Sequence, residues 1–295
     1  MNFKVRKGKG VRGEITIPGD KSISHRSIMC ASLAEGKSRI YGFLEGEDCI
    51  ATKLAFKDMG IKFETNIDEI IVHGSGLYGL KEPQKEINLG NSGTSIRLLS
   101  GILSAQKFSS TLIGDESLSS RPMRRIIEPL SLMGADIKSQ NSGRPPLEIG
   151  ISEKLNSINY DLPIASAQVK SCILFASLYS EGKTVVRESQ TTRNHTEIMF
   201  KQFGVPLSIR DTGDGRNIEM YSPSNLKSTE IDIPGDFSSA AFFILAALII
   251  PNSNLTIKNV GINETRTALL NAFREMGAEI DIINKTGEFE PRADL

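Results

Sequence analysis

The chain has 295 residues, and at roughly 150 residues per domain this length predicts about two domains. Hydrophobic residues make up 39% and charged residues 24% of the sequence, a composition that excludes a disordered chain. Lys and Arg together number 35, as do Asp and Glu, so the net charge of zero excludes a global basic field for nucleic acid or an anionic membrane surface. Any binding of anions must therefore depend on a local cluster of cations.

The sequence carries no signal for export, for a membrane span or for a metal. The basic amino end is not followed by the apolar stretch of a secretory signal. The longest apolar run, residues 240–250, has eleven residues and is too short to span a bilayer. Three separated cysteines and three isolated histidines predict reduced thiols, no metal centre and no cofactor. We therefore expect a cytoplasmic protein that binds neither membranes nor nucleic acid.

One pattern of elements occurs four times along the chain, with a period of about 72 residues. Each copy begins with a strand and a capped helix, followed by a short strand, a helix that ends at a glycine, and a hairpin. The opening strands are predicted at 14–18, 87–89, 160–163 and 230–234, and the second strands at 38–41, 110–113, 184–187 and 255–258. The predicted N-caps are Asp20, Asn91, Ser166 and Asp236, and the helix-ending glycines are Gly60, Gly134, Gly204 and Gly277. The chain is therefore predicted to be an α/β protein of repeated βαβαββ units.

The helix predicted in the fourth repeat indicates how these units pack. Residues 240–250 are apolar on all sides, so we expect this helix to be buried in a core. This predicts helices inside and sheets outside, with the helix N-termini converging toward one end of a domain. A helix N-terminus presents unpaired N–H groups and a partial positive charge, so several together form a site for anions.

Cations and small hydroxyls recur at the starts of the first three of these helices. Lys21, Ser22 and Arg26 occupy the first two turns of the first helix, and Gly93 allows a ligand close to the backbone of the second. The third start, residues 165–171, reads ASAQVKS. For any single helix, plain capping with solvated Lys and Arg is an equally good interpretation, but the recurrence favours a shared anion site. Neither a GxxxxGK[ST] loop nor a GxGxxG motif occurs, so nucleotide binding of those kinds has no support.

Two further arginines are candidates for the same site. Pro122 suits the first position of a helix, so Arg121 is predicted just before that helix. We expect its side chain to be directed toward the anion site at the helix N-termini. Arginine is suited to bidentate capture of phosphate or carboxylate. Arg193 precedes another predicted helix and adds a cation. The three histidines have no partner visible in the sequence and are interpreted as non-catalytic: His25, His73 and His195.

At these motifs the chain resembles the 5-enolpyruvylshikimate-3-phosphate synthase family. The matching segments occur in the family's order: GDKSISHR at 19–26, LGNSGTSIRLL at 89–99, SRPMRR at 120–125, ASAQVKS at 165–171 and RNHTE at 193–197. The resemblance implies an inside-out arrangement of six βαβαββ units, three in each domain. It also implies transfer of the enolpyruvyl group of phosphoenolpyruvate to the 5-hydroxyl of shikimate 3-phosphate, with release of phosphate, in aromatic amino acid biosynthesis.

The resemblance also assigns roles to residues of this chain. The implied contacts to shikimate 3-phosphate are Lys21, Ser22, Arg26, Ser166, Gln168 and Arg193. The implied contacts to phosphoenolpyruvate are Lys21, Gly93, Arg121 and Gln168. Ala167 stands where many members have a serine, so no side-chain contact is assigned to it. The reaction needs a proton at the methylene carbon and a base for the attacking hydroxyl, and Lys21 is the catalytic candidate for one of these transfers.

The family has six units and this chain has four, so we expect a C-terminally truncated chain. Its complete domain is expected at 15–233, and one third of a second domain at 1–14 with 235–295. In relatives the remaining segment supplies an aspartate and a glutamate for acid–base chemistry and further cations. The 295-residue chain alone is therefore expected to bind shikimate 3-phosphate weakly and to be inactive. The full-length protein is expected to be a monomer.

Three alternative functions remain open from the sequence. A UDP-N-acetylglucosamine enolpyruvyl transferase has a similar fold. However, that family has a lysine–asparagine pair where this chain has Lys21 and Ser22, and most of its members carry a loop cysteine that is missing here. An RNA-processing cyclase of similar repeats is disfavoured by the zero net charge. A non-catalytic anion-binding module would fit a gene that ends at residue 295.

Overall fold

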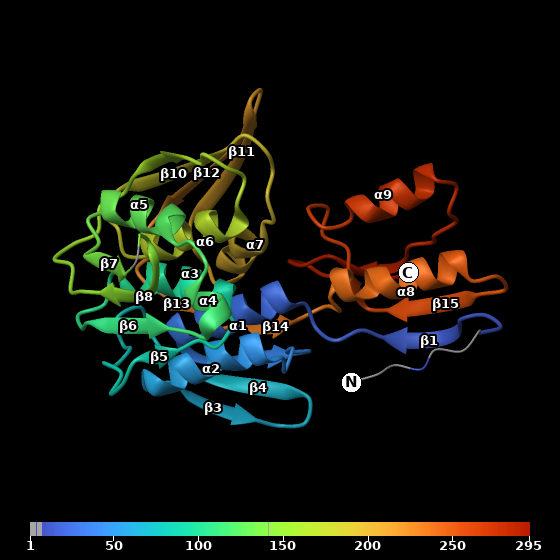
Figure 1. The fold of residues 1–295 in the computed structure, drawn as a ribbon, viewed down its shortest axis with the longest axis horizontal. Coiled ribbons are helices and arrows are strands. Elements are labelled where there is room, and N and C mark those ends of the chain that lie inside the picture. Colours follow the sequence, from blue (N-terminus) through green and yellow to red (C-terminus); the bar gives the residue numbers. More distant parts are fainter. Residues whose placement is uncertain (1–3, 5–7, 141) are drawn as a thin grey trace. The chain divides into compact units, whose positions relative to one another are not determined.

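The computed structural model describes residue 4, residues 8–140 and residues 142–295. The chain forms two compact units (Figure 1). The larger unit is Lys21–Asp232, and the smaller unit joins the segment that ends at Asp20 to Ile233–Leu295. The chain therefore crosses between the units twice, directly after the first Ile-Pro-Gly-Asp segment (17–20) and directly before the second (233–236).

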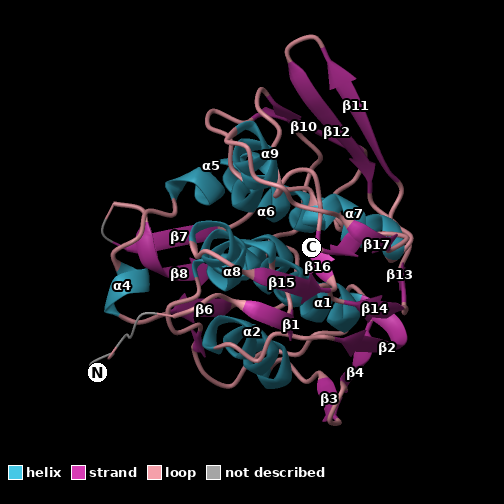
Figure 2. Cartoon of the chain, turned by 90° about the vertical axis from the view of Figure 1, so that its right-hand side faces the viewer, coloured by secondary structure: helices cyan, strands magenta, loops and turns pink. Residues whose placement is uncertain are grey.

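Three sheets form the outside of the larger unit. The first has the order β13-β2-β4-β3, with β14 also paired to β2: β2 (Ala34–Tyr41), β3 (Lys62–Thr65), β4 (Glu69–Ser75), β13 (Leu226–Lys227) and β14 (Glu230–Asp232). The second has the order β5-β6-β8-β7: β5 (Ile87–Asn88), β6 (Ser110–Ile113), β7 (Ile137–Gln140) and β8 (Arg144–Ile149). The third has the order β11-β12-β10-β9: β9 (Asn159–Asp161), β10 (Lys183–Glu188), β11 (Leu207–Thr212) and β12 (Gly215–Tyr221). The β11–β12 hairpin is the long ribbon at the upper right of Figure 2.

The opening helices of the first three repeats lie inside this unit, as the predicted arrangement of inner helices and outer sheets requires. These are α1 (Lys21–Leu33), α3 (Gly93–Leu103) and α6 (Ala167–Ser177), and nearly all of their residues are buried. Helices α3 and α6 pack closely because Gly101 has no side chain: a Cβ there would lie 2.2 Å from the carbonyl oxygen of Cys172. The other helices are α2 (Glu47–Asp58), α4 (Glu116–Ser119), α5 (Arg124–Leu132) and α7 (His195–Gln202). The predicted fold of repeated βαβαββ units, with helices inside and sheets outside, is confirmed.

The opening strands of the first and fourth repeats are exchanged between the units. The sequence pattern assigns residues 14–18 to the first repeat, but β1 (Arg12–Thr16) pairs in parallel with β15 (Asn254–Lys258) of the smaller unit. Conversely, β14 pairs in parallel with β2 of the larger unit. The prediction that each repeat is contiguous is therefore wrong for these two copies. A local pattern identifies a strand but not its partner, because parallel pairing joins segments far apart in the sequence.

In the part of the chain that the structure describes, the smaller unit is one repeat with two helices, the β1–β15 pair and a further sheet. It contains α8 (Phe237–Ile249), α9 (Ala268–Glu275) and a three-stranded sheet with the order β16-β18-β17: β16 (Val260–Gly261), β17 (Ile283–Thr286) and β18 (Arg292–Asp294). Its core cluster comprises Phe237, Ala240, Ile244, Ile257, Val260 and Leu270.

Helix α8 is apolar but is not buried on all sides. Only Phe237, Ala240 and Ile244 of this helix are buried, while Phe242 is 77% and Ile249 is 68% exposed. The prediction of a buried core helix is therefore wrong for the described part of the chain, where one repeat covers one face of α8. None of the described helices is long and apolar enough to cross a membrane.

Candidate active site

The first turns of α1, α3 and α6 lie together in the larger unit. Arg97 on α3 donates from Nη1 to Gln168 Oε1 on α6 at 2.8 Å, and Gln168 donates from Nε2 to Thr94 Oγ1 at 3.1 Å. Arg26 on α1 donates from Nη2 to Ser171 Oγ on α6 at 2.8 Å. These contacts join the N-terminal ends of the three helices, so their partial positive charges add at one place.

Serine caps two of these helices. Ser166 accepts from the backbone N–H of Val169 at 3.4 Å, as the sequence predicts, and Asp236 likewise caps α8 by accepting from Ser238 at 2.7 Å. The prediction of Asn91 as a cap is wrong, because Ser92 caps α3 by accepting from Ser95 at 3.2 Å. Capping by the next residue leaves the Asn91 amide available for the neighbouring loop.

Asn91 and Gly93 bring Arg121 to the start of α3. The Arg121 guanidinium donates to Asn91 Oδ1, and Asn91 donates to Asp115 Oδ2 at 2.8 Å. A Cβ on Gly93 would lie 2.8 Å from a terminal nitrogen of both Arg121 and Arg97. Glycine therefore leaves room for two guanidinium groups beside the helix start.

The cluster around Gly93 has excess positive charge. Burial lowers the pKa of Arg97 from its usual value, and the charges of Arg121 and Arg125 lower it further. Like charges held this close repel one another, and an anion bound between them relieves that repulsion. The arrangement is therefore suited to a phosphate or a carboxylate. Sequence reasoning did not select Arg97, although its place one turn after Gly93 on the same helix was a usable signal.

Arg26 is almost fully buried and is held by three helices. Its Nε donates to Thr196 Oγ1 on α7 at 2.6 Å, and its Nη1 donates to the carbonyl oxygen of Ser22 at 2.9 Å. With the contact to Ser171, this guanidinium links α1, α6 and α7. The hydroxyl groups of Thr196 and Ser171 and the Ser22 carbonyl group therefore fix the orientation of Arg26.

Lys21 occupies the first position of α1 and is half exposed. Its Nζ lies 2.8 Å from Asp48 Oδ2, in the first turn of α2. Asp48 is a second residue that sequence reasoning missed, because α1 and α2 belong together only in the folded unit. The sequence feature that could have identified Asp48 is the acidic first turn of α2, which contains Glu47 and Asp48.

The remaining predicted residues lie on elements that border this cluster. Gln168 is held between Arg97 and Thr94, and Ser166 immediately precedes α6. Arg193 is exposed in the loop between β10 and α7, three residues before the Thr196 that contacts Arg26. His25 is buried, and burial lowers its pKa to about 3, so its imidazole is neutral at physiological pH.

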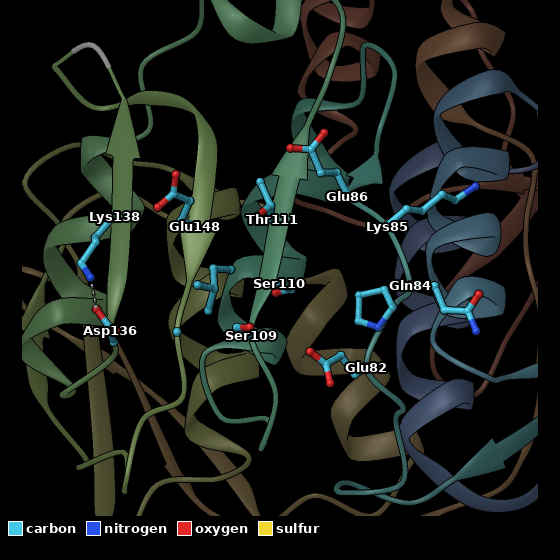
Figure 3. Close-up of a pocket in the computed structure, with 13 residues that line it drawn as sticks. Glu82, Gln84, Lys85, Glu86, Ser109, Ser110, Thr111, Asp136, Lys138 and Glu148 are labelled. Carbon is cyan, nitrogen blue, oxygen red and sulfur yellow. Dashed lines mark ion pairs between the residues drawn. The ribbon is translucent and has the colours of Figure 1, made fainter.

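A groove on the outer sheet β5-β6-β8-β7 has the opposite character. Figure 3 shows the carboxylates of Glu82, Glu86, Asp136 and Glu148 around it, with Lys85 and Lys138. Lys138 lies 3.6 Å from Asp136, so part of the positive charge is already neutralised. This groove is unsuited to a substrate with several negative charges.

The fold and the cluster together define the class: an α/β protein of βαβαββ repeats with cations gathered at converging helix starts. The model of the EPSP synthase (3-phosphoshikimate 1-carboxyvinyltransferase) family matches residues 5–292. The chain therefore belongs to this family of transferases, and the family predicted from the motifs is confirmed.

Relatives and solved structures agree with this assignment. The chain is 52% identical to the 3-phosphoshikimate 1-carboxyvinyltransferase of Legionella pneumophila (strain Lens) and 50% identical to that of Methylococcus capsulatus, covering 100% and 99% of this chain and 67% of each relative. A structure of EPSP synthase from Acinetobacter baumannii is similar with a TM-score of 0.90 and 48% identity, over 98% of this chain and 64% of that one. The chain thus spans about two thirds of the length of the relatives that it matches.

Proposed function

We propose that this chain binds shikimate 3-phosphate and phosphoenolpyruvate in a 3-phosphoshikimate 1-carboxyvinyltransferase. The observation that carries the proposal is the cluster of Arg26, Arg97 and Arg121 at the joined starts of α1, α3 and α6. Both substrates carry a phosphate and a carboxylate, so four anionic groups must share one site. Only a concentrated set of cations and helix N-termini offsets their mutual repulsion in a protein without net charge.

In this proposal each predicted residue contacts one substrate, except that Lys21 and Gln168 contact both. Lys21, Ser22, Arg26, Ser166, Gln168 and Arg193 bind shikimate 3-phosphate. Lys21, Gly93, Arg121 and Gln168 bind phosphoenolpyruvate, and Arg97 adds a cation on that side, 2.8 Å from Gln168. The enzyme acts as a cytoplasmic monomer.

The proposed reaction is an addition followed by an elimination. The 5-hydroxyl of shikimate 3-phosphate adds to C2 of phosphoenolpyruvate and gives up its proton, while C3 gains a proton and becomes a methyl group. The tetrahedral adduct then loses a proton from that methyl group and expels phosphate, which restores the double bond. In this proposal Lys21 exchanges one of these protons, and Asp48 orients its ammonium group through their contact of 2.8 Å.

Binding and turnover of the full-length protein test the proposal. We expect calorimetry to detect binding of shikimate 3-phosphate and to show much weaker binding of UDP-N-acetylglucosamine. Lys21→Met is expected to lower kcat by roughly 10²-fold or more, the usual contribution of a positioned acid or base. The matched control is Lys37→Met, on the exposed side of β2, which should turn over as the parent does.

Three results would contradict the proposal. Tighter binding of UDP-N-acetylglucosamine would favour the sister transferase. Unchanged turnover in Lys21→Met would remove the role of Lys21. Binding of shikimate 3-phosphate without any product from phosphoenolpyruvate would favour a non-catalytic anion-binding module.

A further inference from the structure

A buried cluster of three charges lies behind the cation site. Lys170 on α6 is fully buried, and its Nζ lies 2.9 Å from Glu188 Oε2 and 2.7 Å from Glu197 Oε1. Both carboxylates are also buried, at 0% and 1% side-chain exposure. Glu188 ends β10 and Glu197 lies in the first turn of α7, so one ammonium group connects three elements.

The single ammonium group of Lys170 contacts both carboxylates. Each uses one oxygen for the ammonium group, while Glu188 Oε1 and Glu197 Oε2 accept no hydrogen bond from the described residues. Removing three charges from water is costly, and apolar side chains of similar volume often serve stability as well or better. A role in stability is therefore a weak explanation for this cluster, and a role in fixing geometry is a better one.

The cluster fixes both ends of the loop that carries Arg193. This loop, residues 189–194, joins Glu188 to α7, and Glu197 follows it by one turn. Within the loop, Thr192 donates to Glu188 Oε2 from its backbone N–H at 3.3 Å and from its hydroxyl at 2.7 Å. Arg193 is the next residue. The path of the loop before Arg193 is therefore set by the same carboxylate oxygen that Lys170 holds.

The cluster also fixes how α6 meets α7 beside Arg26. Lys170 and Glu197 are each adjacent in sequence to a second pair, Ser171 and Thr196, whose hydroxyl oxygens lie 2.7 Å apart. Both of these hydroxyl groups accept hydrogen bonds from the Arg26 guanidinium. The ion pair of Lys170 and Glu197 is thus adjacent to the two hydroxyl groups that orient Arg26.

We propose that Lys170, Glu188 and Glu197 are positioning residues that hold Arg193 and Arg26 in the arrangement that binds shikimate 3-phosphate. The inference rests on the proposed function and assigns the buried cluster to one substrate of the two. The cluster acts through the loop 189–194 and through the α6–α7 contact. Its loss therefore weakens binding of shikimate 3-phosphate and leaves the phosphoenolpyruvate side, around Gly93 and Arg121, unchanged.

The most direct test removes the hydrogen bond between the Thr192 hydroxyl and Glu188 and leaves the two ion pairs of Lys170 in place. Thr192→Val keeps the side-chain shape and removes the hydroxyl that donates to Glu188. We expect the Kd for shikimate 3-phosphate of the full-length protein, measured by calorimetry, to rise roughly tenfold, as for one lost hydrogen bond to a charged group. The KM for phosphoenolpyruvate should stay unchanged, while the melting temperature should fall by a few degrees because a buried carboxylate loses one of its hydrogen bonds. Thr191→Val, at the exposed neighbouring position, is the matched control and should bind as the parent does.

A second pair of variants shows whether the effect passes through Arg193. Arg193→Ala should weaken binding of the same substrate, and adding Thr192→Val to it should weaken binding little further. Glu188→Gln, which retains an acceptor oxygen, should raise the same Kd and speed amide hydrogen exchange in residues 189–194.

The outcomes separate the inference from the proposed function. A parent protein that does not bind shikimate 3-phosphate overturns the proposed function and this inference with it. A parent that binds while Thr192→Val and Glu188→Gln bind equally well overturns the inference alone. Effects of Thr192→Val and Arg193→Ala that multiply in the double variant overturn it as well, because they would be independent.

Discussion

Helices α1 and α8 begin equivalent repeats, yet they differ sharply in burial. Helix α1 carries a lysine, a histidine, an arginine and several serines, and every residue from Ile23 to Leu33 is buried. Helix α8 has no charged residue, and only three of its residues are buried. Burial therefore depends on how many repeats surround a helix more than on how apolar its sequence is. The larger unit has three sheets around its helices, whereas the described part of the smaller unit places one repeat beside α8.

Each unit also has a cation that bridges two carboxylates, and the two bridges differ in burial. In the smaller unit, Arg266 lies 2.9 Å from Asp20 and 3.2 Å from Asp236, the two aspartates that end the Ile-Pro-Gly-Asp segments. Asp20 and Asp236 retain 6% and 13% side-chain exposure, and Arg266 also donates to Ser238. Lys170 in the larger unit has carboxylate partners that are nearly inaccessible to water. Loss of the cation should therefore cost more in the larger unit, where the remaining charges cannot be hydrated.

The largest expected effect comes from breaking the two bridges. Lys170→Met should lower the free energy of unfolding by about 3–5 kcal/mol, because it leaves two buried carboxylates without a counter-charge. Arg266→Met should cost less, and Lys154→Met, at the exposed pair with Glu181, should cost about 1 kcal/mol or less. Urea denaturation followed by circular dichroism measures all three. Equal losses for Lys170→Met and Lys154→Met would show that burial does not distinguish these ion pairs.

A matched pair of isoleucines tests the contrast between α1 and α8 directly. Ile28 on α1 is 0% exposed and Ile249 on α8 is 68% exposed. Ile28→Ala should destabilise the chain by about 2–5 kcal/mol through lost burial and a cavity. Ile249→Ala should change stability by less than about 0.5 kcal/mol, as at an ordinary surface position. A large loss for Ile249→Ala in urea denaturation would mean that something covers this face of α8 in solution.

The sequence predicted the repeat well because its landmarks are local. The four helix-ending glycines adopt positive φ angles of 91°, 94°, 81° and 91°, the left-handed conformation that the pattern requires: Gly60, Gly134, Gly204 and Gly277. Helix starts, glycine stops and hairpins each depend on a few neighbouring residues. The motif residues at the candidate site, which come from the same helix starts, could be found in the same way.

What the sequence could not predict depends on contacts between distant segments. The exchange of β1 and β14 is invisible locally, because both strands have the expected pattern and differ only in partner. Asp48 and Arg97 were missed because their roles come from Lys21 on another helix and from Arg121 on another loop. From its position Lys170 is one more cation at a helix start, whereas the structure buries its ammonium group in the interior. Each omission is a tertiary pairing, which propensity and spacing do not encode.

The smallest expected effect is a loss of stability at low pH that arises in the larger unit alone. All three histidines lie in the larger unit, and His25 is held there by a hydrogen bond of 2.7 Å to Thr52. Burial, assisted by the positive charge of Arg26, lowers its pKa from 6.5 to about 3. Between these values the unfolded chain binds a proton that the folded chain does not, so stability falls as pH falls below 6.5. From pH 7.5 to pH 5.5 the loss should be about 1.4 kcal/mol for this one group.

Replacing the histidine tests this sign and this size. His25→Asn retains a group that can hydrogen-bond to Thr52 and should reduce the loss between pH 7.5 and pH 5.5 by about 1.4 kcal/mol, whatever its stability at pH 7.5. Thr191→Val, at an exposed position without a titratable group, is the control and should retain the parent's dependence on pH. Urea denaturation at the two pH values measures the difference. If the parent and His25→Asn lost the same free energy of unfolding between the two pH values, the interior of the larger unit would accommodate the charged imidazole. Burial of a helix in this unit would then not exclude charge from it.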